Sequence, residues 1–209
     1  MPKINKLNSS IFIIWLFTIS GIIGISSNSQ DWFLENTPLN LTIYFILILL
    51  NIKSYNYKLI VALSIPFFLG FISEGLGVNY GYIFGSYNYG ENLGHKVWGV
   101  PVTICFNWVV LTVITNDLGK RFLKNTFFIS ILGAFLMTLL DVIIEVSAPR
   151  FDYWEFEKGV VPIQNYMGWF GVAFLAHILY SLFRVKSNQK LSLHLLLAIT
   201  VFFSIFLVL

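Results

Sequence analysis

Three acidic residues lie within or at the ends of long apolar segments: Glu74, Asp141 and Glu145. A carboxyl group surrounded by hydrocarbon costs about 3 kcal/mol unless it keeps its proton or finds a partner. Three such groups in a chain of 209 residues therefore indicate chemistry. A buried carboxyl that keeps its proton can deliver it to a carbon–carbon double bond. A second, ionised carboxyl can then polarise the water that captures the carbocation.

An acid–aromatic–proline–tryptophan pattern occurs twice around these residues. In each copy an acid ends one apolar segment, a loop rich in Tyr, Trp and Phe follows, and a proline precedes a tryptophan by seven positions. The pairs are Pro101 with Trp108 and Pro162 with Trp169. This internal repeat predicts two similar helix–loop–helix units with a site between them. We expect Trp108 and Trp169 to line one cavity from opposite sides, with Trp108 near the membrane centre and Trp169 higher.

The composition predicts the elements that position these residues. The chain is 57% hydrophobic and only 11% charged, whereas soluble domains carry about 25% charged residues. We expect an all-α, polytopic membrane helix bundle that forms a single integral membrane domain over residues 1–209. About seven transmembrane helices can be drawn, and the second is the weakest because its apolar core is short. They cover residues 11–25, 39–52, 59–78, 98–115, 127–146, 166–183 and 191–209.

Lys and Arg are distributed unevenly among the connections. Of the 13 basic residues, ten lie in the N-terminal segment and in the second, fourth and sixth loops. The remaining three are Lys96, Arg150 and Lys158. Basic residues favour the cytoplasmic side, so we expect a multi-pass protein of the cell inner (cytoplasmic) membrane with the N-terminus cytoplasmic and the C-terminus outside. The loops 79–97 and 147–164 are then external, and the net charge of +3 requires no nucleic-acid partner.

A signal peptide is a weaker interpretation of the first apolar segment. The segment ends in Ile25-Ser26-Ser27 without a small-x-small cleavage site.

The Cys and His content argues against disulfides and metal sites. The only cysteine, Cys105, excludes an internal disulfide and a cysteine-based metal site. His177 and His194 lie in expected spans without a ligand at metal-binding spacing, so we expect packing or hydrogen bonding and no metal.

Several blocks of sequence carry a family resemblance. They are EGLG at 74–77, GYIFGSYNY at 81–89, GVP at 99–101 with Trp108, LD at 140–141 with Glu145, YW at 153–154, and Pro162 with Asn165 and GW at 168–169. Over about residues 60–185 the chain resembles the membrane carotenoid 1',2'-hydratases, a family often described simply as carotenoid biosynthesis proteins. Two departures concern loop geometry: Val160 stands where glycine is usual, and no proline directly follows Glu145.

The resemblance implies a hydro-lyase-type carotenoid hydratase. Such an enzyme adds water across the terminal 1,2 (1',2') double bond of an acyclic carotenoid end group without a cofactor. The substrate lies within the lipid bilayer, and other carotenoid-biosynthesis enzymes are candidate partners. We expect Asp141, the deepest carboxyl, to be the acid, Glu145 to orient the water, and Glu74 to be an alternative base. The expected substrate-binding residues are Tyr82, Tyr87, Tyr89, Trp108, Tyr153, Trp154, Asn165 and Trp169.

Two other functions fit the same residues. A lycopene-cyclase-like carotenoid cyclase begins with the same proton transfer and differs only in how the cation is captured. A proton-coupled membrane transporter also uses paired acids within the membrane, as a proton relay. The product distinguishes the two enzymes, and transport activity without an effect on pigment would favour the transporter.

The charge distribution generates a topological prediction. A cysteine placed at Asn92 or Lys158 should react with an impermeant thiol reagent added to intact cells, because both positions lie in loops expected to be external. Labelling that occurs only after lysis would reverse the topology.

Overall fold

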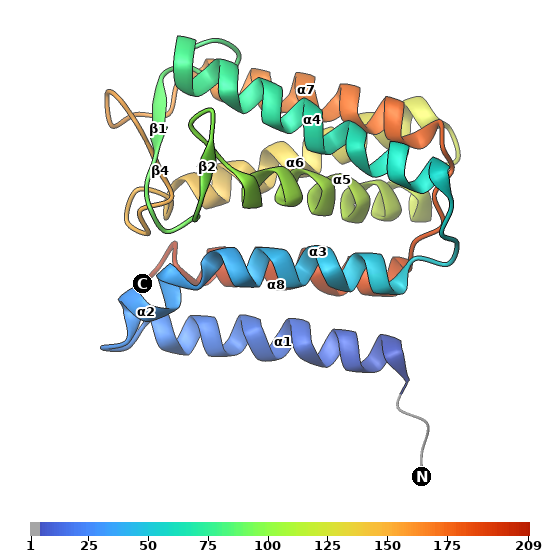
Figure 1. Cartoon of the computed structure of the whole chain (residues 1–209), viewed down its shortest axis with the longest axis horizontal. Helices are drawn as coiled ribbons and strands as arrows, with labels where there is room; N and C mark the ends of the chain where they lie inside the picture. Colours follow the sequence, from blue (N-terminus) through green and yellow to red (C-terminus); the bar gives the residue numbers. More distant parts are fainter. Residues whose placement is uncertain (1–4) are drawn as a thin grey trace.

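Long helices lying side by side make up most of the chain. The computed structural model describes residues 5–209, so Lys3, which contributes to the charge bias, lies outside the described residues. The long helices run along one common direction (Figure 1). They are α1 (Lys6–Ile25), α3 (Thr37–Asn51), α4 (Tyr57–Tyr80), α5 (Val102–Phe122), α6 (Thr126–Glu145), α7 (Ile163–Ser181) and α8 (Gln189–Ile205).

The remaining elements are short. Helix α2 (Gln30–Glu35) connects α1 to α3, and the strands have two or three residues each. The strands are β1 (Tyr87–Tyr89), β2 (Lys96–Val97), β3 (Val100–Pro101) and β4 (Trp154–Phe156). The prediction of a helical fold is therefore confirmed.

Each expected span overlaps one long helix. Helices α1, α4, α5 and α6 are long and apolar enough to cross a membrane, and α3 and α8 are shorter apolar helices. At 1.5 Å per residue, α3 is about 22 Å long, which agrees with the weakness expected for the second span. Several apolar helices thus indicate a membrane protein, and seven crossings remain a prediction.

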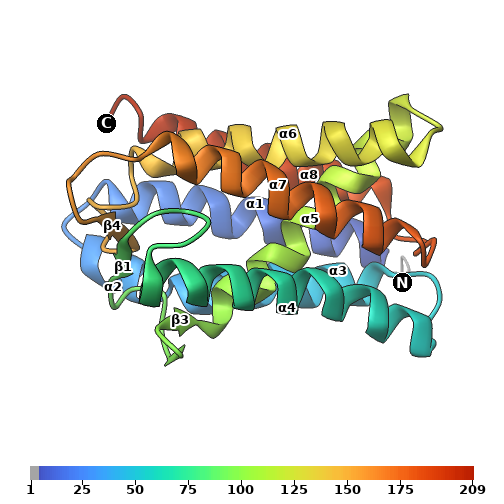
Figure 2. The same cartoon turned by 90° about the horizontal axis from the view of Figure 1, so that it is seen from above.

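The connections separate to the two ends of the bundle (Figures 1 and 2). The loops that carry β1–β4, at residues 81–101 and 146–162, gather at one end, which we call the strand end. The connections α3–α4, α5–α6 and α7–α8 lie at the other end, which we call the basic end because Lys and Arg gather there. The two loops expected to be external therefore share one end of the molecule.

Asparagine caps start the helices that rise from the basic end. The Asn5, Asn56 and Asn125 side chains each accept a hydrogen bond from a backbone N–H in the first turn of α1, α4 and α6. Asn188 accepts from Lys190 and Leu191 at the start of α8. Since the first N–H groups of a helix lack intrahelical acceptors, these caps define where the four helices begin.

Prolines start the helices that run back from the strand end. Pro101 precedes α5 and Pro162 precedes α7. The fourth expected span, 98–115, starts too early, because β2 and β3 form a hairpin at Trp98 and α5 begins at Val102. The two-residue turn of the hairpin has positive φ at both Trp98 (52°) and Gly99 (77°), the geometry of a type I′ turn, which cannot continue into a helix.

The two loops at the strand end pair with each other. Strand β1 pairs antiparallel with β4, with Tyr87 opposite Phe156 and Tyr89 opposite Trp154. The strands come from the two copies of the repeated pattern, so the copies meet as expected. That the two copies form similar helix–loop–helix units remains a prediction.

Helix α5 lies at the centre of the bundle and contacts α3, α4, α6, α7 and α8. Its Trp108 side chain is fully buried and fits against α4 because position 70 is glycine. A Cβ atom at Gly70 would lie 2.4 Å from Cγ of Trp108, closer than any van der Waals contact. Gly70 therefore sets how closely α4 approaches α5.

This contact generates a prediction about stability. Gly70→Ala should destabilise the fold by about 1–3 kcal/mol, because overpacking forces a buried side chain from its position. Thermal unfolding in a mild detergent would measure the effect, expected at about 2–4 °C per kcal/mol for a chain of this size. Gly171→Ala is the matched control, since no atom lies within 4 Å of the added Cβ. Equal melting temperatures for the two variants would contradict the close contact.

Candidate active site

Glu74, Asp141 and Glu145 line one small cavity at the strand end of the bundle. Glu74 belongs to α4, and the other two belong to α6, one turn apart. Each side chain is less than a tenth exposed. The cavity measures about 30 Å³, and a water needs about 10–15 Å³ by this measure, so it has room for about two waters. The structure therefore brings the three candidate carboxyls together.

Glu74 is held by three hydrogen-bond donors. The indole Nε1 of Trp108 donates to Oε1 at 2.9 Å, and the hydroxyl of Tyr89 donates to Oε2 at 2.8 Å. The hydroxyl of Tyr87 also donates to Oε2. Burial, reinforced by the neighbouring Glu74 carboxyl, raises the pKa values of Tyr87 and Tyr89 well above the usual value for tyrosine. Both phenols therefore keep their protons and remain donors to Glu74.

Asp141 and Glu145 share a single amide. Nδ2 of Asn165 donates to Oδ2 of Asp141 at 2.7 Å and to Oε1 of Glu145 at 3.2 Å. Trp154 donates its indole N–H to the other oxygen of Glu145 at 3.0 Å. Among residues 5–209, Oδ1 of Asp141 has no hydrogen-bond donor, so this oxygen is the one free to meet a ligand in the cavity.

Two tryptophans stack beside the carboxyls. The rings of Trp108 and Trp169 lie 4.5 Å apart, centroid to centroid, at an interplanar angle of 12°. Each tryptophan lies seven residues after the proline that caps its helix. The two side chains are therefore at the same depth in the bundle. The expectation of different depths, on opposite sides of a cavity, is wrong, because α5 begins at Val102, after the hairpin, and not at Trp98 as the fourth expected span does. Trp169 lines the small cavity, and Trp108 backs it.

A second, apolar cavity lies next to the carboxyls. It measures about 430 Å³ and is walled by α1, α2, α3, α5 and α8, with Ile144, Tyr153 and Trp154. Volumes of about 300–1,000 Å³ are typical of ligand pockets. Leu16, Trp32 and Leu39 line it and are at least half exposed, so it opens on the apolar outer surface of the bundle.

The two cavities share a wall. The residues that line both are Ile104, Asn107, Leu111, Ile144 and Trp154. A ligand in the apolar cavity is therefore separated from the carboxyls only by these side chains. This wall is apolar except for Asn107 and the indole N–H of Trp154, which already donates to Glu145.

Asn107 is a site residue that the sequence analysis missed. Its amide makes no hydrogen bond to another group in the described part of the chain, although it faces both cavities. A polar amide without a partner at the mouth of a carboxyl cavity can bind a water or a hydroxyl group. The available signal was an asparagine beside Trp108 in the outer half of an otherwise apolar segment.

The expected substrate-binding residues divide into four groups, of which Tyr82 alone forms the last. Tyr87, Tyr89, Trp154, Asn165 and Trp169 line the small cavity, and Tyr153 lines the apolar one. The Tyr153 hydroxyl lies 3.0 Å from Oγ1 of Thr37, and burial raises its pKa to about 12. Trp108 lines neither cavity but donates to Glu74 and stacks on Trp169.

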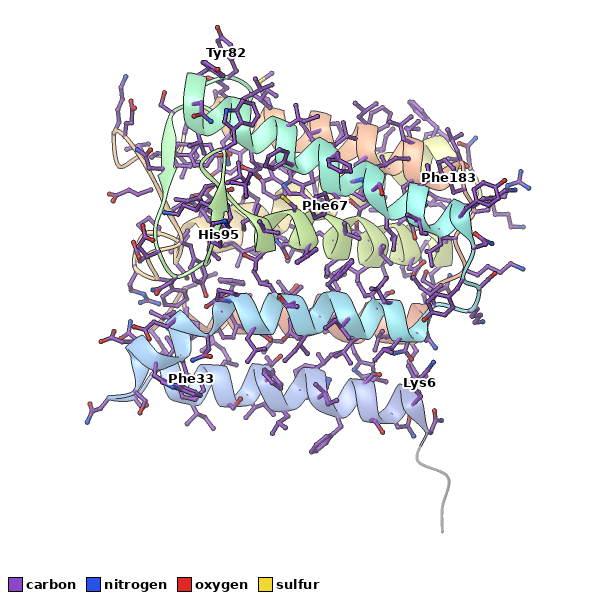
Figure 3. The ribbon with its side chains drawn as sticks, viewed as in Figure 1. Lys6, Phe33, Phe67, Tyr82, His95 and Phe183 are labelled. Atoms are coloured by element: carbon purple, nitrogen blue, oxygen red, sulfur yellow. The ribbon has the colours of Figure 1, made fainter. Side chains whose placement is uncertain are left out.

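Tyr82 belongs to neither cavity. It is 62% exposed, points outward beyond the end of α4 and stacks on Tyr80 (Figure 3). The structure places Tyr82 outside both cavities because Gly81 ends α4 in a left-handed conformation with φ of 68°. That turn directs the chain, and Tyr82 with it, away from the bundle.

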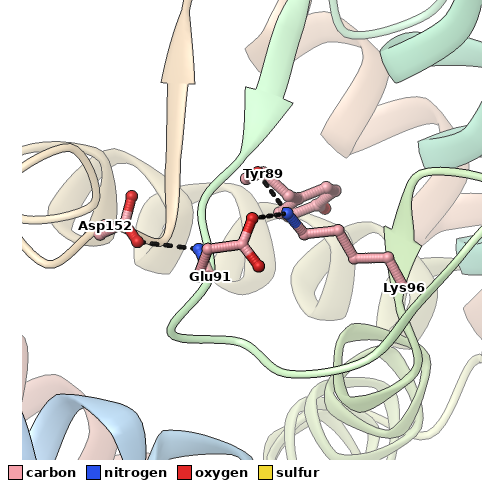
Figure 4. A network of polar contacts seen from close by, with 4 residues as sticks. All are labelled: Tyr89, Glu91, Lys96 and Asp152. Atoms are coloured by element: carbon pink, nitrogen blue, oxygen red, sulfur yellow. Dashed lines mark hydrogen bonds and ion pairs between the residues drawn. The ribbon is translucent and has the colours of Figure 1, made fainter.

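A polar network holds the loops over the site (Figure 4). Nζ of Lys96 donates to Oε1 of Glu91 at 2.9 Å and to the backbone carbonyl of Tyr89 at 2.8 Å. The backbone N–H of Glu91 donates to Oδ2 of Asp152 at 2.8 Å. Lys96 and Asp152 therefore hold the chain where β1 ends, at Tyr89 and Glu91, which helps to fix Tyr89 against Glu74.

The histidines make hydrogen bonds within the bundle. Nε2 of His177 lies 2.8 Å from Oγ1 of Thr115, and Nδ1 of His194 accepts from the indole of Trp15 at 3.0 Å. Within residues 5–209, no group of three His, Cys, Asp or Glu residues is arranged to hold a metal ion.

The fold and the site define a helical membrane protein with a buried carboxyl centre beside an apolar cavity. A family model described as "Carotenoid biosynthesis protein" matches residues 37–209, and the chain belongs to this family. The matched region contains all three carboxyls and every residue of the small cavity. No curated protein and no solved structure gives a significant match.

Proposed function

We propose that the chain is a carotenoid hydratase that adds water across the terminal 1,2 (1',2') double bond of an acyclic end group. Membership of the carotenoid biosynthesis family supports an enzyme that acts on a carotenoid within the bilayer. The single observation that carries the proposal is the shared wall, where an apolar cavity of about 430 Å³ meets a cavity containing three carboxyls. An end group in the first cavity would present its double bond to acids in the second.

The apolar cavity would receive the end group from the lipid. Its opening is lined by Leu16, Trp32 and Leu39, all on the surface of α1, α2 and α3. A cavity of this volume holds an end group and not a whole C40 polyene, so the rest of the chain would remain in the membrane. Binding then requires no extraction of the polyene into water, which would be costly because each buried CH₂ contributes about 0.8 kcal/mol.

Asp141 would act as the general acid. Its Oδ1 has no donor within the described residues, so a proton on that oxygen would point into the cavity. Transfer of the proton to carbon 2 forms a C–H bond from the π electrons and leaves a tertiary cation at carbon 1. A water oxygen then bonds to carbon 1 and releases a proton to Glu145. Return of that proton to Asp141 through cavity water closes the cycle, with a net addition of H₂O.

Aromatic faces and Glu74 would stabilise the cation. Trp154 and Trp169 both line the carboxyl cavity, and a dry aromatic face contributes up to about 2 kcal/mol to a nearby cation. Three donors at Glu74 favour the ionised form, because an ionised carboxylate accepts at both oxygens. Glu74 would therefore supply a fixed negative charge, and Asp141, with one donor, would supply the proton.

A lycopene-cyclase-like reaction is the second candidate. The shared wall contains the apolar side chains Ile104, Leu111 and Ile144, which suit a folded end group whose second double bond captures the cation. The same acid would start this reaction. The products differ in mass, since cyclisation is an isomerisation and hydration adds one water.

The first prediction of this mechanism concerns Asp141. Expression of the chain in a bacterium that makes lycopene or gamma-carotene should give a pigment heavier by one water. Asp141→Asn should lower product by about 10²–10⁴-fold, because it removes the transferable proton, while the amide oxygen can still accept from Asn165. Mass spectrometry of the pigments measures the product, and detergent-solubilised yield checks folding.

Asp152→Asn is the matched control, since Asp152 lies at the strand end outside both cavities and Asn can still accept from Glu91. Near-native activity of Asp141→Asn would move the acid to Glu74 or Glu145. A pigment of unchanged mass with altered absorption would establish the cyclase instead, and no pigment change at all would contradict both enzymes.

The second prediction concerns Asn107, which is placed to hold the attacking water. Asn107→Leu keeps the size of the side chain but removes the amide, so alcohol formation should fall by about tenfold, the value of one lost hydrogen bond. Protonation at carbon 2 should continue. In D₂O the recovered substrate should therefore gain deuterium at carbon 2, as the cation forms and loses a proton again.

Asp141→Asn should lose both hydration and deuterium exchange, which separates the acid from the water-binding residue. Loss of deuterium exchange in Asn107→Leu would mean that Asn107 acts before protonation, and the assignment to water capture would be wrong.

A further inference from the structure

A third hollow lies at the basic end, far from the carboxyls. It measures about 730 Å³ and is formed by the end of α5, the start of α6 and the α7–α8 connection, with Lys53 from the α3–α4 connection. Figure 1 shows these connections together at the end of the bundle opposite the strands.

Six basic side chains from five segments line this hollow. They are Lys53, Lys120, Lys124, Arg184, Lys186 and Lys190. The one ion pair among residues 5–209 joins Lys96 and Glu91 at the strand end. None of the six cations therefore has a carboxylate partner within ion-pair distance in the described part of the chain, and their charges add.

The single acid in the hollow is already engaged. Asp117 is 2% exposed, and its carboxylate accepts from Oγ of Ser187 at 2.6 Å and from Oγ of Ser192 at 2.7 Å. These bonds fasten the α7–α8 connection to α5. The backbone N–H of Lys53 donates to the carbonyl of Lys186 at 3.1 Å and joins the α3–α4 connection to it. The wall of the hollow is thus held together by specific contacts.

Two helix N-termini add to the positive potential. Helix α6 begins at Thr126 and α8 at Gln189, and both residues line the hollow. A helix N-terminus carries the positive end of the helix dipole and favours anions. Arg184 has a left-handed backbone with φ of 49°, which L-residues rarely adopt. The α7–α8 connection therefore holds this lining residue in a conformation that its own backbone does not favour.

The positive-inside tendency explains why basic residues gather at this end, but not why they surround one hollow. Lys6, Lys58 and Arg121 lie at the same end, are exposed and remain outside it. Six of the nine described cations of the basic end therefore converge on a single concave site.

We propose that this hollow binds a phosphate group, either the phosphodiester headgroup of an anionic membrane lipid or free phosphate. The chemistry is the same for both: a compact anion is held by Lys ammonium groups and by the planar fork of Arg184. Basic pockets between helices on the expected cytoplasmic side are suited to lipid headgroups. This proposal is independent of the reaction at the carboxyls.

The test compares two triple variants whose substituted side chains are all exposed. R184Q/K186Q/K190Q removes three cations of the hollow, and K6Q/K58Q/R121Q removes three from outside it. Each protein is placed in nanodiscs of phosphatidylcholine, with or without phosphatidylglycerol, and its thermal unfolding is followed. In a second arm, inorganic phosphate is titrated into phosphatidylcholine nanodiscs, with chloride at equal ionic strength as the reference.

Either phosphatidylglycerol or inorganic phosphate should raise the melting temperature of the unmodified protein. The affinity should fall by about tenfold or more in the first variant and by less than about twofold in the second, because the three cations of the first variant line the hollow and those of the second lie outside it. Stabilisation by phosphatidylglycerol alone identifies a lipid site, and stabilisation by phosphate identifies a free-anion site. No stabilisation in either arm, or equal losses in the two variants, would overturn the proposal.

Discussion

The need to satisfy carboxyl groups inside an apolar bundle governs the strand end of this protein. Glu74 takes its donors from β1 and α5, whereas Asp141 and Glu145 take theirs from α7 and β4. Because an unsatisfied buried charge costs several kcal/mol, the two loops and both returning helices must close on the acids together. The pairing of β1 with β4 joins the two loops through their backbones, and the network around Lys96 holds them through polar side chains.

Proline placement converts the repeated spacing in the sequence into a shared depth in the structure. Pro101 and Pro162 each end a loop and start a helix, so a tryptophan seven positions later lies two turns inside the bundle in both cases. The two indoles can then stack, while the indole N–H of Trp108 remains free to bind Glu74. Gly70 makes room for this arrangement. Trp108 thus both packs against Gly70 and donates a hydrogen bond to Glu74. This is why the candidate site and the close contact between α4 and α5 occur at the same place.

Much of this arrangement could be predicted from the sequence, because apolar length and buried charge leave strong signals. The seven helical segments and the convergence of Glu74, Asp141 and Glu145 follow from those signals. The start of α5 could not be predicted from hydropathy, since no charged residue separates the Trp98–Gly99 turn from the helix that follows it. Tyr82 has the same residue type as Tyr87 and Tyr89, and only the left-handed Gly81 directs it outward. Asn107 and the apolar cavity depend on side chains from α1, α2, α3 and α8, which meet only in three dimensions.

The pairing of β1 with β4 has a consequence for how a long substrate would be handled. The paired loops cover the carboxyl cavity at the strand end, while the apolar cavity opens sideways. In the proposed reaction the active site is therefore a blind pocket that admits one tip of a rod-shaped molecule and provides no exit on the far side. A symmetrical polyene could not be threaded through. After one tip had reacted, the rod would have to withdraw, turn end for end in the membrane and enter again. Singly modified molecules would accumulate first, and other membrane enzymes could compete for the unreacted tip.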